Sequence, residues 1–273
     1  MSTDPMRPVP DDRIHGDDYR QAEPGDAAGE QVNRASTRPY WVLAGLGAAL
    51  VVGSLVGAGA WTSLTGGAWH SADERQVYAQ PVSAVTIDGG ADDVEVRGGG
   101  TSGRVEVVRH LSWGQGSSRP AVSETWSGQT LQIGSACNGV VDFCSVDYVV
   151  IVPDTTAVAI TGGSGDVELV GALGEVDVKT GSGRLDGRDL ASATLKATAG
   201  SGDIDLSFET APTSLTLEAG SGDVSVRVPD DRGYATAITT GSGEEDVSAR
   251  VDPGSQSRLT IRTGSGDVEV TSS

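Results

Sequence analysis

The residues with the clearest chemical potential are four aspartates that recur at one position of a repeated tetrapeptide. Asp166, Asp203, Asp223 and Asp267 each follow the tripeptide Gly-Ser-Gly. Equivalent positions of a repeat stack on one another, so these carboxylates would form a ladder of like charges, interrupted only by Arg184. A bound calcium ion would relieve that repulsion. The alternative is structural, because aspartates in tight turns hydrogen-bond nearby backbone amides.

The chain has only two cysteines, Cys137 and Cys144. Two thiols without a nearby histidine are too few ligands for a metal site. A membrane span predicted below places both cysteines on the exported side, where an even pair favours a disulfide. The alternative is a pair of buried thiols. We therefore predict a Cys137–Cys144 disulfide.

Catalytic machinery is hard to find in this sequence. The three histidines, His15, His70 and His110, lie in three different segments, and no metalloprotease, Walker A or nucleophile-elbow motif is present. Residues 98–103 satisfy the GxGxxG spacing, but a strand pattern follows where a dinucleotide site needs a helix. The repeated serines have no partner histidine that could activate them. We expect no enzymatic activity and no cofactor, calcium aside.

The elements that would position these residues follow from the repeat itself. The first glycines of six Gly-Ser-Gly corners lie 18 to 23 residues apart, and a near-fixed period in this range is typical of a solenoid. Glycine and serine suit tight turns, so we predict one corner per coil. The corner glycines are Gly163, Gly165, Gly181, Gly183, Gly200, Gly202, Gly220, Gly222, Gly241, Gly243, Gly264 and Gly266.

Aliphatic and polar residues alternate on both sides of each corner, which predicts a half-buried β-strand before and after it. If coils stack in sequence order, Leu217 should point inward between Ala197 and Ile238. The fifth corner departs from the pattern, and we expect residues 244–246 to be a small insertion that bulges outward. The last strand, residues 268–270, would then form an uncovered end and a place for self-association.

The predicted fold is therefore all-β. It is a β-solenoid of stacked coils of about 20 residues with Gly-Ser-Gly-Asp corners. Residues 154–273 hold the regular coils, and residues 82–153 form an irregular β cap that begins with a degenerate coil at 89–96. Trp113 and Trp126 are expected as the larger core residues of the cap.

One transmembrane helix is predicted ahead of the solenoid, over residues 40–61. Residues 42–60 carry no charge and are long enough to span the bilayer. Arg34 and Arg38 precede the helix, so residues 1–39 should be a disordered cytoplasmic tail. Residues 62–81 would be a linker to an extracytoplasmic domain, in a single-pass protein of the cell membrane. A GxxxG match at 53–57 could pair two such helices.

The charge of the chain narrows the choice of partners. The formal net charge is −19. An acidic surface argues against binding to nucleic acid and against electrostatic docking on anionic lipid.

Residues 82–273, with their ladder of GSGDVEV-like coils after the degenerate GGADDVEV coil, resemble the bacterial putative-adhesin family, a domain of unknown function. The resemblance implies a β-solenoid that is often membrane-anchored, sometimes at cell-envelope stress loci, with no defined catalytic residues. We therefore expect a non-enzymatic envelope protein that presents an acidic rod to an envelope protein or cell-surface ligand, for adhesion or scaffolding. The alternatives are an envelope-stress sensor or accessory subunit that signals through the tail, and a calcium-stabilised surface module.

Overall fold

The computed structural model describes residues 69–137, 143–171 and 173–273. Every regular element in these ranges is a β-strand, which confirms the all-β prediction. None of the described residues belongs to a helix long and apolar enough to cross a membrane. The predicted tail and transmembrane helix, residues 1–39 and 40–61, lie outside the described ranges.

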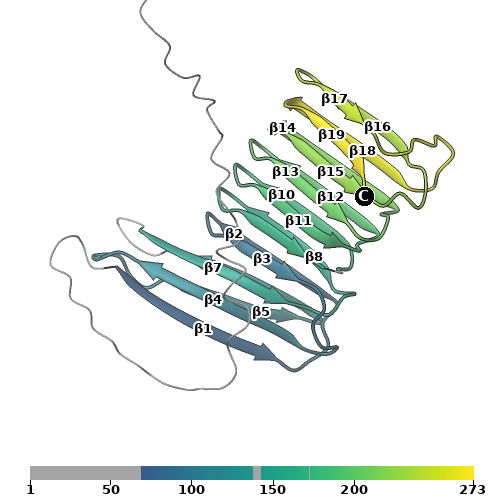
Figure 1. Ribbon diagram of the computed structural model, residues 1–273. Helices are drawn as coiled ribbons and strands as arrows, with labels where there is room; N and C mark the ends of the chain where they lie inside the picture. Colours follow the sequence, from purple (N-terminus) through teal and green to yellow (C-terminus); the bar gives the residue numbers. More distant parts are fainter. Residues whose placement is uncertain (1–68, 138–142, 172) are drawn as a thin grey trace, which may run out of the picture. The chain divides into compact units, whose positions relative to one another are not determined.

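Two sheets face each other and are built largely from parallel strands (Figure 1). The ten-stranded sheet has the order β1 (His70–Tyr78), β4 (Val105–Trp113), β7 (Cys144–Ile151), β3 (Val94–Arg97), β9 (Val167–Val170), β11 (Leu185–Leu190), β13 (Ile204–Phe208), β15 (Val224–Val228), β19 (Val268–Ser272) and β17 (Glu245–Val247). The nine-stranded sheet has the order β16 (Ala235–Thr240), β18 (Arg258–Ser265), β14 (Ser214–Ser221), β12 (Thr194–Ala199), β10 (Val176–Thr180), β8 (Ala157–Gly162), β2 (Ala84–Gly90), β6 (Thr130–Ala136) and β5 (Ala121–Ser127).

Each solenoid coil contributes one strand to each sheet, and the corner tetrapeptides join the two strands. The register is the one predicted from the corner alignment: Val176 pairs with Val158 on one side and with Leu195 on the other. Alternate side chains point into a single aliphatic core between the sheets, where Leu217 is fully buried. Eight coils stack in parallel along the described part of the rod, in the spatial order β6–β7, β2–β3, β8–β9, β10–β11, β12–β13, β14–β15, β18–β19 and β16–β17.

The last coil in the sequence is not the last coil in the stack, contrary to our prediction. Strand β18 lies between β14 and β16, and β19 lies between β15 and β17. Figure 1 shows β16 and β17 beyond the yellow C-terminal strands. Leu217 therefore pairs with Ala197 and Ile261, and Ile238 lies one coil further out. The expected open end at residues 268–270 is wrong, and self-association through it loses its structural basis.

The polarity of the outermost coil explains this order. The coil β18–β19 places Leu259 and Val268 inward, and both are fully buried. At the paired positions, β16 and β17 carry Thr236 and Glu245. The more apolar coil gains more from having neighbours on both sides, so the polar coil lies at the end. The predicted bulge is also wrong, because Glu245 is in register with Val268, and its carboxylate accepts a hydrogen bond from the Thr240 amide at 3.0 Å.

The N-terminal end is more regular than predicted. The degenerate corner at residues 89–96 does form a coil, β2–β3, but β6–β7 makes a further parallel coil outside it. Only β1, β4 and β5 among the described strands run antiparallel to their neighbours, and they cap this end. Strand β1 lies within residues 62–81, which were expected to be a linker. Trp113 and Trp126 pack against the core while staying partly exposed.

Candidate functional site

The corner aspartates form a ladder of hydrogen bonds from side chain to backbone. The Asp166 carboxylate accepts from the Arg184 amide at 2.8 Å, and the Asp203 carboxylate accepts from the Asp223 amide at 3.0 Å. Asp223 in turn accepts from the Asp267 amide at 2.9 Å, and Asp267 from the Glu244 amide at 2.8 Å. Each of these carboxylates satisfies a backbone donor of the adjacent coil, which needs no bound ion.

This ladder gives the aspartates the structural role that the sequence left as an alternative to calcium. Arg184 breaks the series. Its backbone amide donates to Asp166, but its side chain has no carboxylate to accept a hydrogen bond from the amide of the next coil. Among the described side chains, no group of three or more His, Cys, Asp or Glu residues is arranged to hold a metal ion. The ladder therefore connects coils along one edge of the rod.

The corner glycines are required because successive coils come very close together. A Cβ atom on Gly183 would overlap with the carbonyl oxygen of Gly165, and one on Gly202 would overlap with that of Gly183. Positive φ, the usual reason for glycine in a tight turn, is not shared by the set: it occurs at the second glycine of only three corners, Gly222, Gly243 and Gly266. The close stacking of backbones thus selects glycine here.

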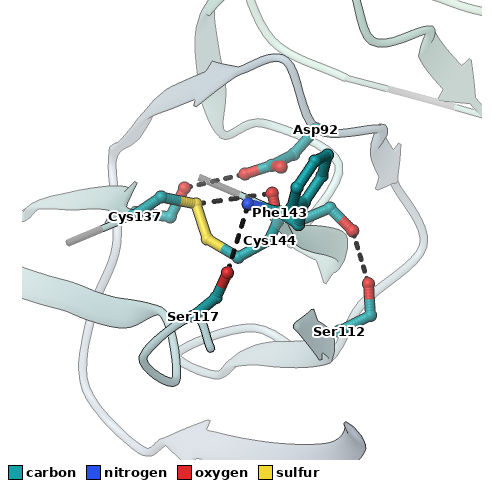
Figure 2. The surroundings of a disulfide bond; sticks show 8 residues. Asp92, Ser112, Ser117, Cys137, Phe143 and Cys144 are labelled. Carbon is teal, nitrogen blue, oxygen red and sulfur yellow. Dashed lines mark hydrogen bonds between the residues drawn. A yellow bond between two sulfur atoms is a disulfide. The ribbon is translucent and has the colours of Figure 1, made fainter. Parts of the chain in front are cut away.

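The disulfide lies at the corner of the coil β6–β7, whereas six other coils carry Gly-Ser-Gly at this place (Figure 2). The structure joins Cys137 to Cys144, with a Cα–Cα distance of 6.1 Å. Beside it, the Phe143 amide donates to the Ser117 hydroxyl at 3.4 Å, and the Ser112 and Ser145 hydroxyls lie 2.7 Å apart. The covalent bond therefore links the residue that follows β6 to the first residue of β7.

The remaining candidate catalytic residues do not converge. His70 stacks on Trp113, with ring centroids 5.5 Å apart, and His110 contacts the Asp73 carboxylate on the surface. No corner serine in the described coils makes a side-chain hydrogen bond to a histidine. Residues 98–103 connect β3 to β4, so the glycine-rich motif lies between two strands.

The outer face of the ten-stranded sheet carries a row of acidic residues. In-register stacking places one such residue from each of several coils on a line across the strands. Arginines interleave with this row: Arg188 lies 3.0 Å from Glu168 and 2.8 Å from Asp186, and Arg184 lies 3.2 Å from Asp205. We call it the acidic row; it consists of Glu95, Glu168, Asp186, Asp205 and Glu269.

A β-bulge makes a hollow in this face. The register shifts between Gly187 and Leu190, so two residues of β11, Arg188 and Asp189, stand opposite the single residue Ser207 of β13. Asp189 has a φ of 55°, the only positive φ at a non-glycine residue in the described chain. The hollow has a volume of about 290 Å³ and is lined by Asp186, Gly187, Arg188, Asp189, Asp205, Ser207 and Arg227.

The chemistry of the hollow suits binding rather than catalysis. Ser207 lies beside Arg227 in the strand register, and no described residue forms an ion pair with Arg227. The Ser207 hydroxyl and the Arg227 guanidinium can donate hydrogen bonds to a polar ligand, and the Asp189 carboxylate can accept one. Sequence reasoning missed the site, although the run Asp186-Gly-Arg-Asp-Leu190 does break the strict alternation of its strand.

A second feature that the sequence did not reveal is an ion pair inside the N-terminal end. Arg109 projects inward from β4 and lies 3.1 Å from Glu124 of β5, and both side chains are largely buried. The Tyr78 hydroxyl donates to Glu124, and burial raises the pKa of Tyr78 to about 12. The signal was an arginine at an inward position of the alternating run from Val105 to Leu111.

The structure resembles solved structures of low sequence identity. A putative cell adhesion protein from Clostridium sporogenes shares 12% identity, with 75% of this chain and 100% of that chain covered and a TM-score of 0.46. A putative adhesin from Parabacteroides merdae also shares 12% identity, with coverages of 74% and 96% and a TM-score of 0.30. No curated protein matches the sequence.

The family is shown by the sequence match over most of the solenoid. Residues 101–273, more than half of the chain, match the Toastrack DUF4097 family. This range begins before β4 and contains all the Gly-Ser-Gly corners. The chain therefore belongs to the Toastrack DUF4097 family.

Proposed function

We propose that this chain is a non-enzymatic, membrane-anchored protein of the cell envelope that presents its β-solenoid outside the cytoplasm as a surface for adhesion or scaffolding. Anchoring rests on the apolar segment 42–60, and the orientation rests on Arg34 and Arg38 before it. The partner would be an envelope protein or another cell-surface ligand.

The observation that carries the proposal is the outer face of the ten-stranded sheet. Four members of the acidic row, Glu95, Glu168, Asp186 and Asp205, lie on successive strands about 4.8 Å apart, with the hollow at Arg188 and Asp189 beside them. Ser225 separates Asp205 from the fifth member, Glu269. A rigid array of this kind fits an extended polar ligand that contacts several coils at once, because many weak ion pairs then act together. The outer face of the nine-stranded sheet offers fewer charges at the corresponding positions, with Ala159 and Thr161 on β8.

The topology is tested first, with full-length protein tagged at both ends in intact protoplasts. Added protease should degrade the C-terminal domain and spare the N-terminal tag. A domain that stays intact until the cells are lysed would contradict the proposed orientation.

The binding face is tested by cross-linking partners to the full-length protein in the same cells. In one variant Glu168→Gln, Asp186→Asn and Asp205→Asn neutralise the acidic row. The matched control carries Asp88→Asn and Glu218→Gln on the outer face of the other sheet. Partners should be lost from the first variant and kept by the control. Equal retention in both would contradict the assigned face, and partners lost only when residues 1–39 are deleted would favour a sensor that acts through its tail.

A further inference from the structure

Two of the exposed large apolar side chains in the described part of the chain lie together at one corner of the solenoid. Trp69 is 68% exposed and Phe143 is 57% exposed. Both border Gly114: a Cβ on that glycine would lie 3.8 Å from the Trp69 ring and 3.2 Å from the Phe143 Cβ. The other two exposed residues, Val77 and Val251, lie in β1 and in the chain between β17 and β18.

Further aromatic rings extend this patch. Strand register places His70 beside Trp113, and Trp113 beside Cys144, so β1, β4 and β7 meet at this corner. The rings of His70 and Trp113 stack, and the Arg119 guanidinium lies 5.9 Å from the centre of the Trp113 ring. We call this patch the aromatic corner and define it as Trp69, His70, Trp113 and Phe143. These four side chains include no carboxylate, in a chain whose net charge is −19.

The position of the aromatic corner in the chain indicates what covers it. The apolar segment ends at residue 60 and Trp61 follows it, so eight residue steps separate Trp61 from Trp69. Even fully extended, eight residues reach at most about 29 Å. The chain thus enters the solenoid at this corner, which is held close to the membrane surface if the segment spans the bilayer.

We propose that the aromatic corner inserts into the interfacial layer of the bilayer that anchors the chain. Tryptophan and other amphipathic rings prefer this layer, where one end of the ring is apolar and the other is hydrated. The contact does not depend on opposite charge, so it is compatible with an acidic domain that anionic lipid would otherwise repel. It holds the rod by one corner and leaves the acidic row free. This inference rests on the membrane anchoring proposed above.

The test uses the full-length chain in phosphatidylcholine vesicles with brominated acyl chains, which quench nearby tryptophan. Trp41→Phe and Trp61→Phe are present throughout, so that tryptophans beside the apolar segment do not report. The Trp69 protein is compared with a Trp69→Phe variant. The control adds Val251→Trp to the Trp69→Phe variant, because Val251 is 51% exposed and lies in the outermost coil region.

Trp113 and Trp126 remain in every variant, so the readout is the difference between proteins. Brominated lipid should quench the protein that contains Trp69 more strongly than the Trp69→Phe variant or the Val251→Trp control, and high salt should leave this difference unchanged. If the chain floats with the vesicles but the protein with Trp69 is quenched no more than the Val251→Trp control, the corner does not touch lipid and the inference is wrong. If the chain does not float with the vesicles at all, the anchoring itself fails and the corner proposal fails with it. Near-ultraviolet circular dichroism confirms that each variant keeps its fold.

Discussion

The second glycine of each corner determines how closely two coils can approach. At Gly202 the space for a side chain is already filled by the carbonyl oxygen of Gly183. The neighbouring Ser201 is exposed and lies on the same turn. Substitutions at Gly202 and Ser201 therefore distinguish the cost of disturbing close backbone packing from the cost of changing any residue of the turn.

We predict that Gly202→Ala destabilises the domain by about 1–3 kcal/mol or more, because the coils must part to make room for a methyl group. Ser201→Ala should change the free energy of unfolding by less than about 0.5 kcal/mol. Urea denaturation of both variants measures the difference. Similar small effects at both positions would contradict the close packing of coils at Gly202.

Asp92 should make the stability depend on pH. It is buried in the first corner and accepts a hydrogen bond from Ser135 at 2.8 Å. Burial raises the pKa of this carboxyl, and burial also raises the pKa of the neighbouring Asp147. Since the pKa is higher in the folded state, folding takes up protons as the pH falls through the window just above the ordinary carboxyl value of about 3.9.

Stability should accordingly rise as the pH falls towards the ordinary carboxyl value of about 3.9 from above, and the rise should be smaller in Asp92→Asn, which cannot titrate. Asp88→Asn, at an exposed position of β2, serves as the control. The urea midpoint at several pH values is the measurement. An Asp92→Asn profile parallel to that of the wild type would remove Asp92 as the cause.

At the scale of elements, the sequence was most informative about strands and their register. The alternation of aliphatic and polar residues predicted which side chains face inward, and the corner glycines predicted which residues pair across coils. Coil order could not be predicted this way, because six coils carry the same Gly-Ser-Gly corner and each fits any of the others in the same register. The order depends on small differences such as Thr236 and Glu245 against Leu259 and Val268.

Leu217 tests the register at the centre of the stack. It is fully buried between Ala197 and Ile261, whereas Thr216 faces outward on the same strand. Leu217→Ala should lower the free energy of unfolding by about 2–5 kcal/mol, and Thr216→Ala by less than about 0.5 kcal/mol. Thermal or urea unfolding gives both values. Equal costs would mean that β14 is displaced by one residue.

At the scale of sites, residues that break the repeat marked the positions of the buried ion pair and of the hollow. Arg109 and the bulge at Arg188 and Asp189 both break the alternation of their strands, but their partners come from other strands. Glu124 pairs with Arg109 only because β5 and β4 belong to opposite sheets at the same end. Such pairings need the three-dimensional arrangement.

Taken as a whole, the solenoid ends in polar groups on both sides of its apolar core. Asp73, Glu74 and Arg75 lie on β1, the edge strand at one end of the ten-stranded sheet, and Glu245 lies on β17, the edge strand at the other end. Charged groups at sheet ends oppose edge-to-edge association, because pairing with another chain would bury them. The faces of the sheets, rather than the ends of the rod, are then left for partners.

The outermost position of β16–β17 decides which coil forms the end of the rod, and a pair of engineered disulfides tests it directly. In the structure Thr216 lies beside Thr260, and Ala237 lies one strand further out. Neighbouring strands are about 4.8 Å apart, within disulfide range, whereas a separation of two strands, about 10 Å, is too far. Mass spectrometry of unreduced peptides should find the new disulfide in Thr216→Cys/Thr260→Cys and not in Thr216→Cys/Ala237→Cys. The opposite result would mean that the coils stack in sequence order and that the C-terminal coil forms the end of the rod.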